Sequence, residues 1–240
     1  DVVTVTNAAN WVFAGLDVRY SVSLLALKKT GNEAQHVLLS GPFYNQADFE
    51  VGKQVQNKLE VSALRTASTG AAFPQLPDAE SVAIFSQIRK APRLDAATAA
   101  WDFRPIREFD ATNDKNTFDA GGEAPGRWPV YGGRSFNIWD PDTGEYYAWA
   151  DPKKVTAALQ EKRERQARTK TSAFYQLDQK IVTDPKTLPC HRPRIAFRDV
   201  TRATDTRTMI SALLPGRVIL TNKAPYFFHA RGPIQDEAYL

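Results

Sequence analysis

The chain has 240 residues, of which 42% are hydrophobic and 11% aromatic, and this composition excludes an intrinsically disordered protein. Its single cysteine, Cys190, excludes an internal disulfide and a zinc site built from several cysteines. The formal net charge is only +4, but residues 153–223 hold 16 Lys and Arg against 6 Asp and Glu.

This uneven charge favours a polyanionic partner for the C-terminal half. Residues 153–223 carry a net charge of +10, so the other residues sum to −6. A positive surface attracts polyanions, and the acidic remainder limits indiscriminate binding. The alternative is that the basic residues only form a solvated face. We expect a soluble, cytoplasmic protein, because no run approaches the roughly 20 apolar residues of a membrane helix and the N-terminus lacks a secretory signal pattern.

Two strands that form a hairpin are predicted at the N-terminus. Residues 2–7 alternate between apolar and polar side chains, as in a half-buried strand, whereas residues 19–28 form a nearly continuous apolar run, as in a buried strand. Because the chain begins at Asp1, directly in a strand, we expect it to be a fragment of a longer polypeptide. A further short strand is predicted at residues 36–44, where it ends in a Gly-Pro pair.

A short amphipathic helix is predicted at residues 78–90. Asp78 is a suitable N-cap, and the segment ends in an Arg-Lys pair that complements the helix dipole. The predicted apolar stripe consists of Val82, Phe85 and Ile88.

A turn-rich, aromatic region follows between residues 101 and 151. Within it, the turn sequence PDTG separates residues 136–139 from residues 145–149, which predicts a hairpin. We expect its aromatic side chains to close a core, and stacking on bases is the alternative. These side chains are Tyr131, Trp139, Tyr146 and Tyr147.

A second helix is predicted after Asp151, which can cap it, with Pro152 at the first helical position. Its narrow apolar stripe contains Val155, Ala158 and Leu159, and the opposite face is strongly charged. The end of the chain then returns to strands, at residues 194–200, 208–214 and 218–222. The predicted fold class is therefore α+β, with mixed or antiparallel sheets and a few short helices.

Arginines on and between these last strands are candidates for nucleic-acid contacts, because forked guanidinium groups on rigid strands suit phosphate and guanine recognition. Arg198 and Arg207 flank a turn-prone segment, and we expect at least one of them to meet a base or a phosphate. The alternative is that ion pairs fix the turn, Arg198 with Asp199 or Arg207 with Asp205.

Polar residues elsewhere extend this candidate set. Asn113, Asp114 and Asn116 can read adenine or cytosine edges, although such residues in a loop often bind their own backbone. Arg168 and Lys170, at the end of the charged helix, are candidates for phosphate contacts. The complete candidate set is Arg194, Arg198, Arg202, Arg207, Thr208, Asn113, Asp114, Asn116, Arg134, Arg168, Lys170 and Lys223.

Motifs for catalysis are weak or missing. The three histidines, His36, His191 and His229, are far apart and lack zinc-binding spacing. No glycine-rich motif for nucleotide binding occurs, and we expect no catalytic residue, bound metal or cofactor in this chain. A metal-dependent nuclease is an alternative, since carboxylates cluster at residues 140–145 and 178–180.

Three segments carry a resemblance to a known family. Residues 103–118, FRPIREFDATNDKNTF, contain an aromatic-Asp-x-Thr-Asn-Asp core followed by Phe, and they precede VYGGRSFNIWDP at 130–141 and RIAFRDVTRATDTRTMISALLP at 194–215. In this order they resemble the target-recognition domain, also called the TaqI-like C-terminal specificity domain, of single-chain type II restriction-modification adenine-specific DNA methyltransferases.

This resemblance implies sequence-specific recognition of double-stranded DNA, which positions a target adenine for methylation. Residues 1–50 resemble the terminal strands of the catalytic domain and its linker, so residues 51–240 would form the target-recognition domain. Neither the Asn/Asp-Pro-Pro-aromatic motif nor the glycine-rich S-adenosylmethionine turn of the family occurs here. The resemblance therefore implies a methyltransferase parent protein that uses S-adenosylmethionine, with its catalytic domain as a partner of this chain. An RNA- or polyanion-binding module without such a partner is the alternative.

Overall fold

The computed structural model describes residues 1–18, 20–28, 34–67, 73–94, 102–118, 122–202 and 205–229. The chain has the expected α+β fold and divides into two compact units, Asp1–Pro92 and Arg93–Leu240. The domain boundary expected at residue 50 falls inside helix α1 (Gln46–Gly52), within the first unit. The assignment of residues 1–50 to a catalytic domain stays a prediction.

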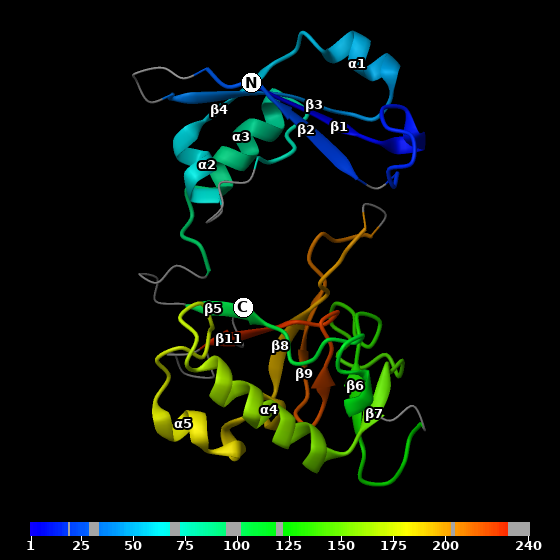
Figure 1. Ribbon diagram of the computed structural model, residues 1–240, viewed down its shortest axis with the longest axis vertical. Helices are drawn as coiled ribbons and strands as arrows, with labels where there is room; N and C mark the ends of the chain where they lie inside the picture. Colours follow the sequence, from blue (N-terminus) through cyan, green and yellow to red (C-terminus); the bar gives the residue numbers. More distant parts are fainter. Residues whose placement is uncertain are drawn as a thin grey trace. The chain divides into compact units, whose positions relative to one another are not determined.

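The first unit contains a four-stranded mixed sheet in the order β2-β1-β3-β4 (Figure 1). Strand β1 pairs antiparallel with β2 and parallel with β3, and β3 pairs antiparallel with β4. The elements are β1 (Val2–Thr6), a 3-10 turn η1 (Ala8–Asn10), β2 (Ser21–Leu25), β3 (His36–Phe43), α1, β4 (Asn57–Glu60), α2 (Val61–Ala67) and α3 (Ala79–Ile88).

The predicted N-terminal hairpin is confirmed, but the burial of its two strands is the reverse of the expectation. Val2 and Val5 of β1 are buried, whereas Leu24 and Leu25 of β2 are 60% and 49% exposed. The reason is the strand order, since β1 lies between two strands and β2 lies at the edge of the described sheet. An apolar run therefore did not indicate a central strand here.

The helix predicted at 78–90 is confirmed as α3. The carboxylate of Asp78 accepts a hydrogen bond from the Ser81 amide (2.7 Å), and Val82 and Phe85 pack on the core of the first unit. Ile88, in the last turn, is instead 62% exposed.

The second unit contains two sheets. The three-stranded sheet has the order β10-β6-β7 and the four-stranded sheet the order β5-β11-β8-β9. Only the β6–β10 pair is parallel among the pairs of named strands here. The strands are β5 (Phe103–Ile106), β6 (Trp128–Tyr131), β7 (Ala148–Ala150), β8 (Arg194–Phe197), β9 (Ser211–Leu214), β10 (Ile219–Leu220) and β11 (Tyr226–His229), and the helices are η2 (Lys115–Thr117), α4 (Pro152–Gln166), α5 (Gln179–Thr183), η3 (Pro185–Thr187) and η4 (Pro189–His191).

Helix α4 confirms the second predicted helix. The Asp151 carboxylate accepts hydrogen bonds from the amides of Lys153 (2.8 Å) and Lys154 (3.2 Å), so it acts as the N-cap. Val155 and Leu159 are buried in one of the two apolar clusters of the second unit. The helix thereby fixes the position of the charged residues that follow it.

The hairpin predicted at residues 136–149 is wrong. Strand β7 pairs with β6, not with residues 136–139, which form a loop closed by an isolated bridge between Asn137 and Asp140. The PDTG sequence does turn, with Gly144 at a φ of +77°, but side chains of this loop satisfy its amides in place of a strand partner.

Candidate nucleic-acid interface

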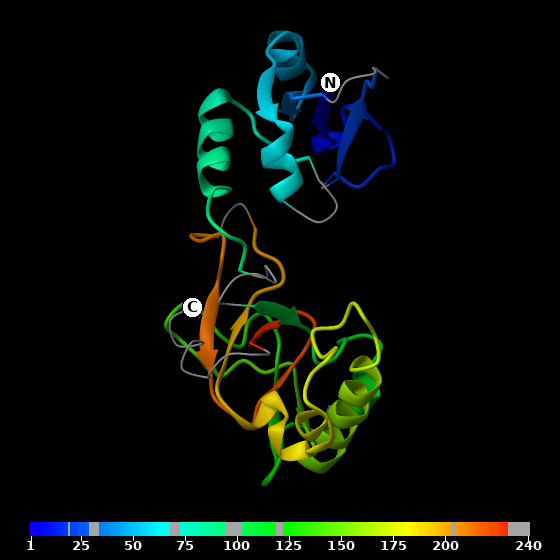
Figure 2. The ribbon, with the colours of Figure 1, turned by 90° about the vertical axis from the view of Figure 1, so that its left-hand side faces the viewer.

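An arm of two segments extends from the ends of β8 and β9, and we define it as residues 198–202 and 205–210. Figure 1 and Figure 2 show this orange segment reaching away from the rest of the second unit. The Arg198 amide donates to the Ile210 carbonyl (2.9 Å), and the Thr201 hydroxyl donates to the Thr208 carbonyl (2.9 Å). These two bonds hold the two segments of the arm together beyond the last β8–β9 pair, although neither segment is a regular strand.

The arm presents three of the predicted residues to solvent: Arg202, Arg207 and Thr208 are exposed. The Arg207–Asp205 ion pair, which was the alternative, is not formed, and the Asp205 carboxylate instead accepts a hydrogen bond from the backbone amide of Arg202 (2.7 Å). Among the described residues, neither arginine forms an ion pair, so both guanidinium groups are available to a ligand.

Arg198 has a different role. It lies at the foot of the arm, which is the end that joins β8 and β9. Its guanidinium is partly buried and donates to the carbonyl of Phe136 (2.9 Å). The alternative Arg198–Asp199 pair is also not formed, and Asp199 instead binds the guanidinium of Arg107 (2.7 Å). Arg198 therefore ties the arm to the loop after β6 and is less accessible than Arg202 or Arg207.

The turn at residues 221–224 brings several predicted segments together. The carbonyl of Lys223 accepts from the Asp199 amide (3.2 Å), and Asn222 accepts from the Ala111 amide (3.1 Å) and donates to Asp110 (3.2 Å). A Cβ on Gly133 would lie 3.4 Å from the Lys223 carbonyl, so the loop that carries Arg134 also passes close by. The exposed side chains of Lys223 and Arg134 thus lie on segments that meet at the foot of the arm.

The loop at residues 110–117 uses its acidic residues on its own backbone. Asp110 accepts from the amides of Thr112 (2.9 Å) and Asn113 (2.8 Å), and Asp114 accepts from the Asp110 amide (2.7 Å). These amides, with a smaller effect of nearby Lys223 and Arg107, hold the pKa of Asp110 below its usual range. Asp114 is thus a structural residue of the loop, whereas the side chains of Asn113 and Asn116 are exposed.

Arg194 was expected to contact DNA, and the structure contradicts this expectation. Its side chain is 1% exposed and forms an ion pair with Glu108 (2.9 Å), which is 3% exposed. Arg194 also donates to the carbonyl of Val218 (3.1 Å), while Glu108 accepts from the amide of Leu220 (2.7 Å). The pair joins the two sheets inside the core. Burial raises the pKa of Glu108, and the charge of Arg194 opposes that rise.

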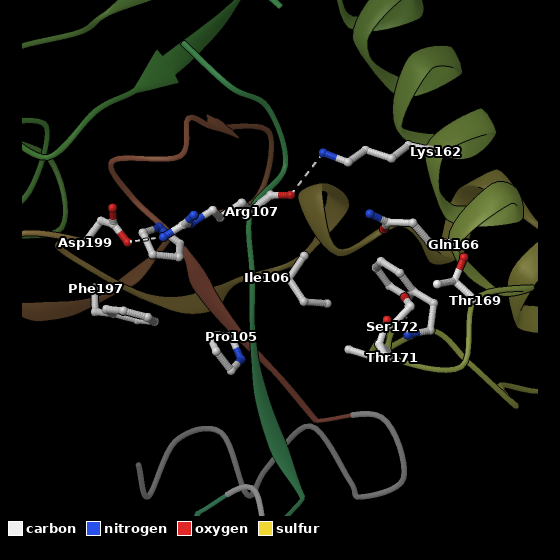
Figure 3. Close-up of a pocket in the computed structure, with 13 residues that line it drawn as sticks. Pro105, Ile106, Arg107, Lys162, Gln166, Thr169, Thr171, Ser172, Phe197 and Asp199 are labelled. Carbon is white, nitrogen blue, oxygen red and sulfur yellow. Dashed lines mark hydrogen bonds and ion pairs between the residues drawn. The ribbon is translucent and has the colours of Figure 1, made fainter. Parts of the chain in front are cut away.

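A cleft of 720 Å³ adjoins the foot of the arm (Figure 3). Arg107 and Asp199 line one wall, where Figure 3 shows them joined by their ion pair. Lys162 lies on the opposite side and donates to the carbonyl of Arg107 (3.2 Å), and burial lowers its pKa. The cleft therefore has the Arg107–Asp199 pair on one side, Lys162 on the other, and a mixed polar and apolar lining.

The sequence interpretation missed the hydroxyl-bearing wall of this cleft. Gln166, Thr169, Thr171 and Ser172 lie along it, in the segment that also carries the exposed Arg168 and Lys170. Hydroxyl and amide groups are common phosphate ligands in protein–DNA complexes. The run of hydroxyl residues directly after the charged helix was the signal that could have indicated them.

No family model, curated protein or solved structure matches this chain. Within the described ranges, no helix is long and apolar enough to cross a lipid bilayer. The same residues contain no group of three or more His, Cys, Asp or Glu side chains arranged to hold a metal ion.

Proposed function

We propose that this chain recognises a specific sequence in double-stranded DNA and that the β8–β9 arm is the element that reads it. The observation that carries the proposal is the exposed pair Arg202 and Arg207 on an arm of two hydrogen-bonded segments that extends from β8 and β9, away from the rest of the second unit. The major groove, about 12 Å wide, admits a two-stranded ribbon, and arginine is the commonest specific ligand of guanine there.

The surroundings of the arm suit phosphate contacts. Lys223 and Arg134 lie on segments that meet at its foot, and Arg168 and Lys170 lie beside the cleft with its hydroxyl-bearing wall. Phosphate contacts set the register of a protein on the duplex, and base contacts set its sequence preference. We assign base reading to the arm, with the exposed Asn113 and Asn116 as a second reading loop.

The resemblance to methyltransferase target-recognition domains supports the same function. Its three segments, 103–118, 130–141 and 194–215, are linked to each other around the arm. Arg198 of the third binds the Phe136 carbonyl of the second, and Asp199 binds Arg107 of the first. We propose that this surface selects the adenine that a catalytic domain of the intact protein methylates with S-adenosylmethionine. We also propose that the intact protein is cytoplasmic.

Duplex binding at several salt concentrations tests the proposal. A pool of random duplexes should yield an enriched sequence, and affinity for it should fall steeply as salt rises because phosphate contacts release counterions. Arg202→Ala and Arg207→Ala should weaken this binding. Lys180→Ala is the matched control, because α5 lies at the opposite end of the second unit from the arm (Figure 1).

Three results would contradict the proposal. The first is an absence of any enriched duplex, and the second is an affinity that neither salt nor the arm substitutions change. The third is tighter binding to single-stranded RNA than to any duplex, which would favour the RNA-binding alternative. Cleavage of plasmid in the presence of Mg²⁺ would instead identify a nuclease.

A further inference from the structure

Trp139 is the most exposed large apolar side chain among the described residues. Its side chain is 96% exposed, whereas Tyr131 is fully buried and Tyr146 stacks on Tyr131 with ring centroids 5.6 Å apart. Tyr131 and Tyr146 therefore close a core, as expected, whereas Tyr147 is 50% exposed and Trp139 is almost fully exposed. An exposed indole loses the large hydrophobic stabilisation that this side chain gains on burial.

The loop that carries Trp139 is held by hydrogen bonds on both sides of it. The amides of Asn137 and Asp140 donate to each other's carbonyls (2.8 and 3.0 Å), and the Ile138 amide donates to the Asn137 side chain (2.9 Å). Further along, the Thr143 hydroxyl donates to the Arg134 carbonyl (2.7 Å). The indole is thus presented by an ordered support.

The backbone of Trp139 is strained. Its φ of +62° lies in the left-handed region, which is a genuine outlier for a bulky residue. Strain of this kind persists only where the surrounding structure imposes it, and it concentrates at binding sites. A sequence under no other constraint would place Asn or Gly at this position.

Trp139 also lies next to the proposed DNA surface. Three residues before it, the Phe136 carbonyl accepts the guanidinium of Arg198 at the foot of the arm. The loop itself is acidic, but Asp142 is engaged by the Gly144 amide (3.0 Å) and the Tyr146 hydroxyl (3.0 Å). Carboxylates repel phosphates, so within residues 137–145 the group suited to contact a duplex is the face of the indole.

We propose that Trp139 stacks on a base of the bound DNA, entering the duplex at a base step beside the groove that the arm occupies. The inference rests on the proposed function and adds an aromatic contact to it. Apolar side chains that insert between base steps are a known means of unstacking and bending DNA. Stacking contributes enough per base that its loss weakens binding roughly 5- to 100-fold.

The test compares Trp139→Asn with Trp139→Phe. Asn tolerates the left-handed backbone, so this variant keeps the loop and should have an unchanged or higher thermal midpoint. We expect Trp139→Asn to weaken duplex binding roughly 5- to 100-fold and Trp139→Phe to retain part of the affinity. Because no charge changes, the slope of log affinity against log salt should stay that of the wild type, unlike the slope of Arg168→Ala, which removes a proposed phosphate contact.

Fluorescence provides the second readout. A 2-aminopurine base placed at each position of the enriched duplex should brighten at one step with the wild-type chain but not with Trp139→Asn.

Wild-type affinity in Trp139→Asn, with no brightening at any step, would overturn the inference while leaving the proposed function intact. Loss of self-association in Trp139→Asn, with unchanged DNA binding, would overturn it in favour of a second copy of the chain. Failure of the wild type to bind any duplex would instead refute the proposed function.

Discussion

Arg194 and Arg207 were both predicted from the sequence to contact DNA, but they have opposite roles in the structure. Arg194 is buried against Glu108 and two backbone carbonyls, and Arg207 is exposed on the arm. A buried charge is tolerated only when a partner and hydrogen bonds compensate for its lost hydration. The free energy of unfolding should therefore depend on Arg194 and the affinity for DNA on Arg207.

Arg194→Ala should destabilise the fold by about 3–5 kcal/mol, because it leaves the Glu108 carboxylate buried without its partner. Urea unfolding of the whole chain measures this loss. Arg207→Ala, at an exposed site, should change stability by no more than about 0.5 kcal/mol. The double variant Glu108→Leu with Arg194→Met should be less destabilised than Arg194→Ala, and equal stability of Arg194→Ala and wild type would refute the assignment.

The lowered pKa of Asp110 predicts a pH dependence of the 110–117 loop. The Asn113 and Thr112 amides favour the ionised carboxylate, so its folded-state pKa lies below the usual 3.8. The contribution of Asp110 to stability is therefore present above about pH 4 and is lost as pH falls through the folded-state pKa. On acidification, the hydrogen-exchange protection factors of these two amides should therefore fall more than those of amides in neighbouring loops.

Asp110→Asn is the control for this dependence. The Asn side-chain oxygen can still accept from both amides but does not titrate, so their protection should no longer respond to acid. An identical acid response in wild type and Asp110→Asn would show that another group controls the loop.

At the scale of elements, the arm is an addition to a sheet that is complete without it. The β8–β9 pair extends from Arg194↔Leu214 to Phe197↔Ser211, and the arm starts beyond the last of these pairs. Replacement of residues 200–208 by Asn-Gly, which suits a two-residue hairpin turn, should leave the sheet folded and abolish sequence-specific binding. Circular dichroism and duplex affinity measure the two outcomes, and retained sequence preference would contradict the role of the arm.

Elements with local signals were predictable from the sequence. Helices α3 and α4 begin at Asp78 and Asp151, whose caps and apolar spacing lie within a few residues of each other. The pairing of β7 with β6 was not predictable, because it depends on contacts between residues about 20 apart and on side chains that close the intervening loop.

The candidate site was likewise predictable only where it did not depend on contacts between residues far apart in the sequence. Exposure of Arg202, Arg207 and Lys223 agreed with their interpretation as surface cations. Burial of Arg194 could not be foreseen, since its partner Glu108 lies 86 residues away. The cleft wall was missed because it forms only when the segment after α4 packs near β5 and β8.

At the scale of the whole molecule, the positive charge belongs to the second unit. Its described residues outside the core include Arg202, Arg207, Lys223, Arg168 and Lys170, all exposed. Each phosphate contact adds to the slope of log affinity against log salt. Arg168→Ala and Lys170→Ala should each reduce that slope by about one while leaving the ratio between specific and nonspecific affinity unchanged.

Arg207→Ala should behave differently from those two variants. A base-reading arginine should lower the ratio of specific to nonspecific affinity, at a cost of about 1–3 kcal/mol toward the preferred duplex. Filter binding or fluorescence anisotropy with the enriched duplex and a scrambled one measures both quantities. An equal loss of affinity for both duplexes would indicate that Arg207 contacts a phosphate rather than a base.

Hydrogen exchange of the whole chain with and without the enriched duplex tests the central claim most directly. We predict that DNA protects the arm, residues 198–202 and 205–210, together with the turn at 221–224, and leaves α5 unchanged. Protection confined to other segments, with the arm exchanging as in the chain without DNA, would contradict the claim that this ribbon enters the groove.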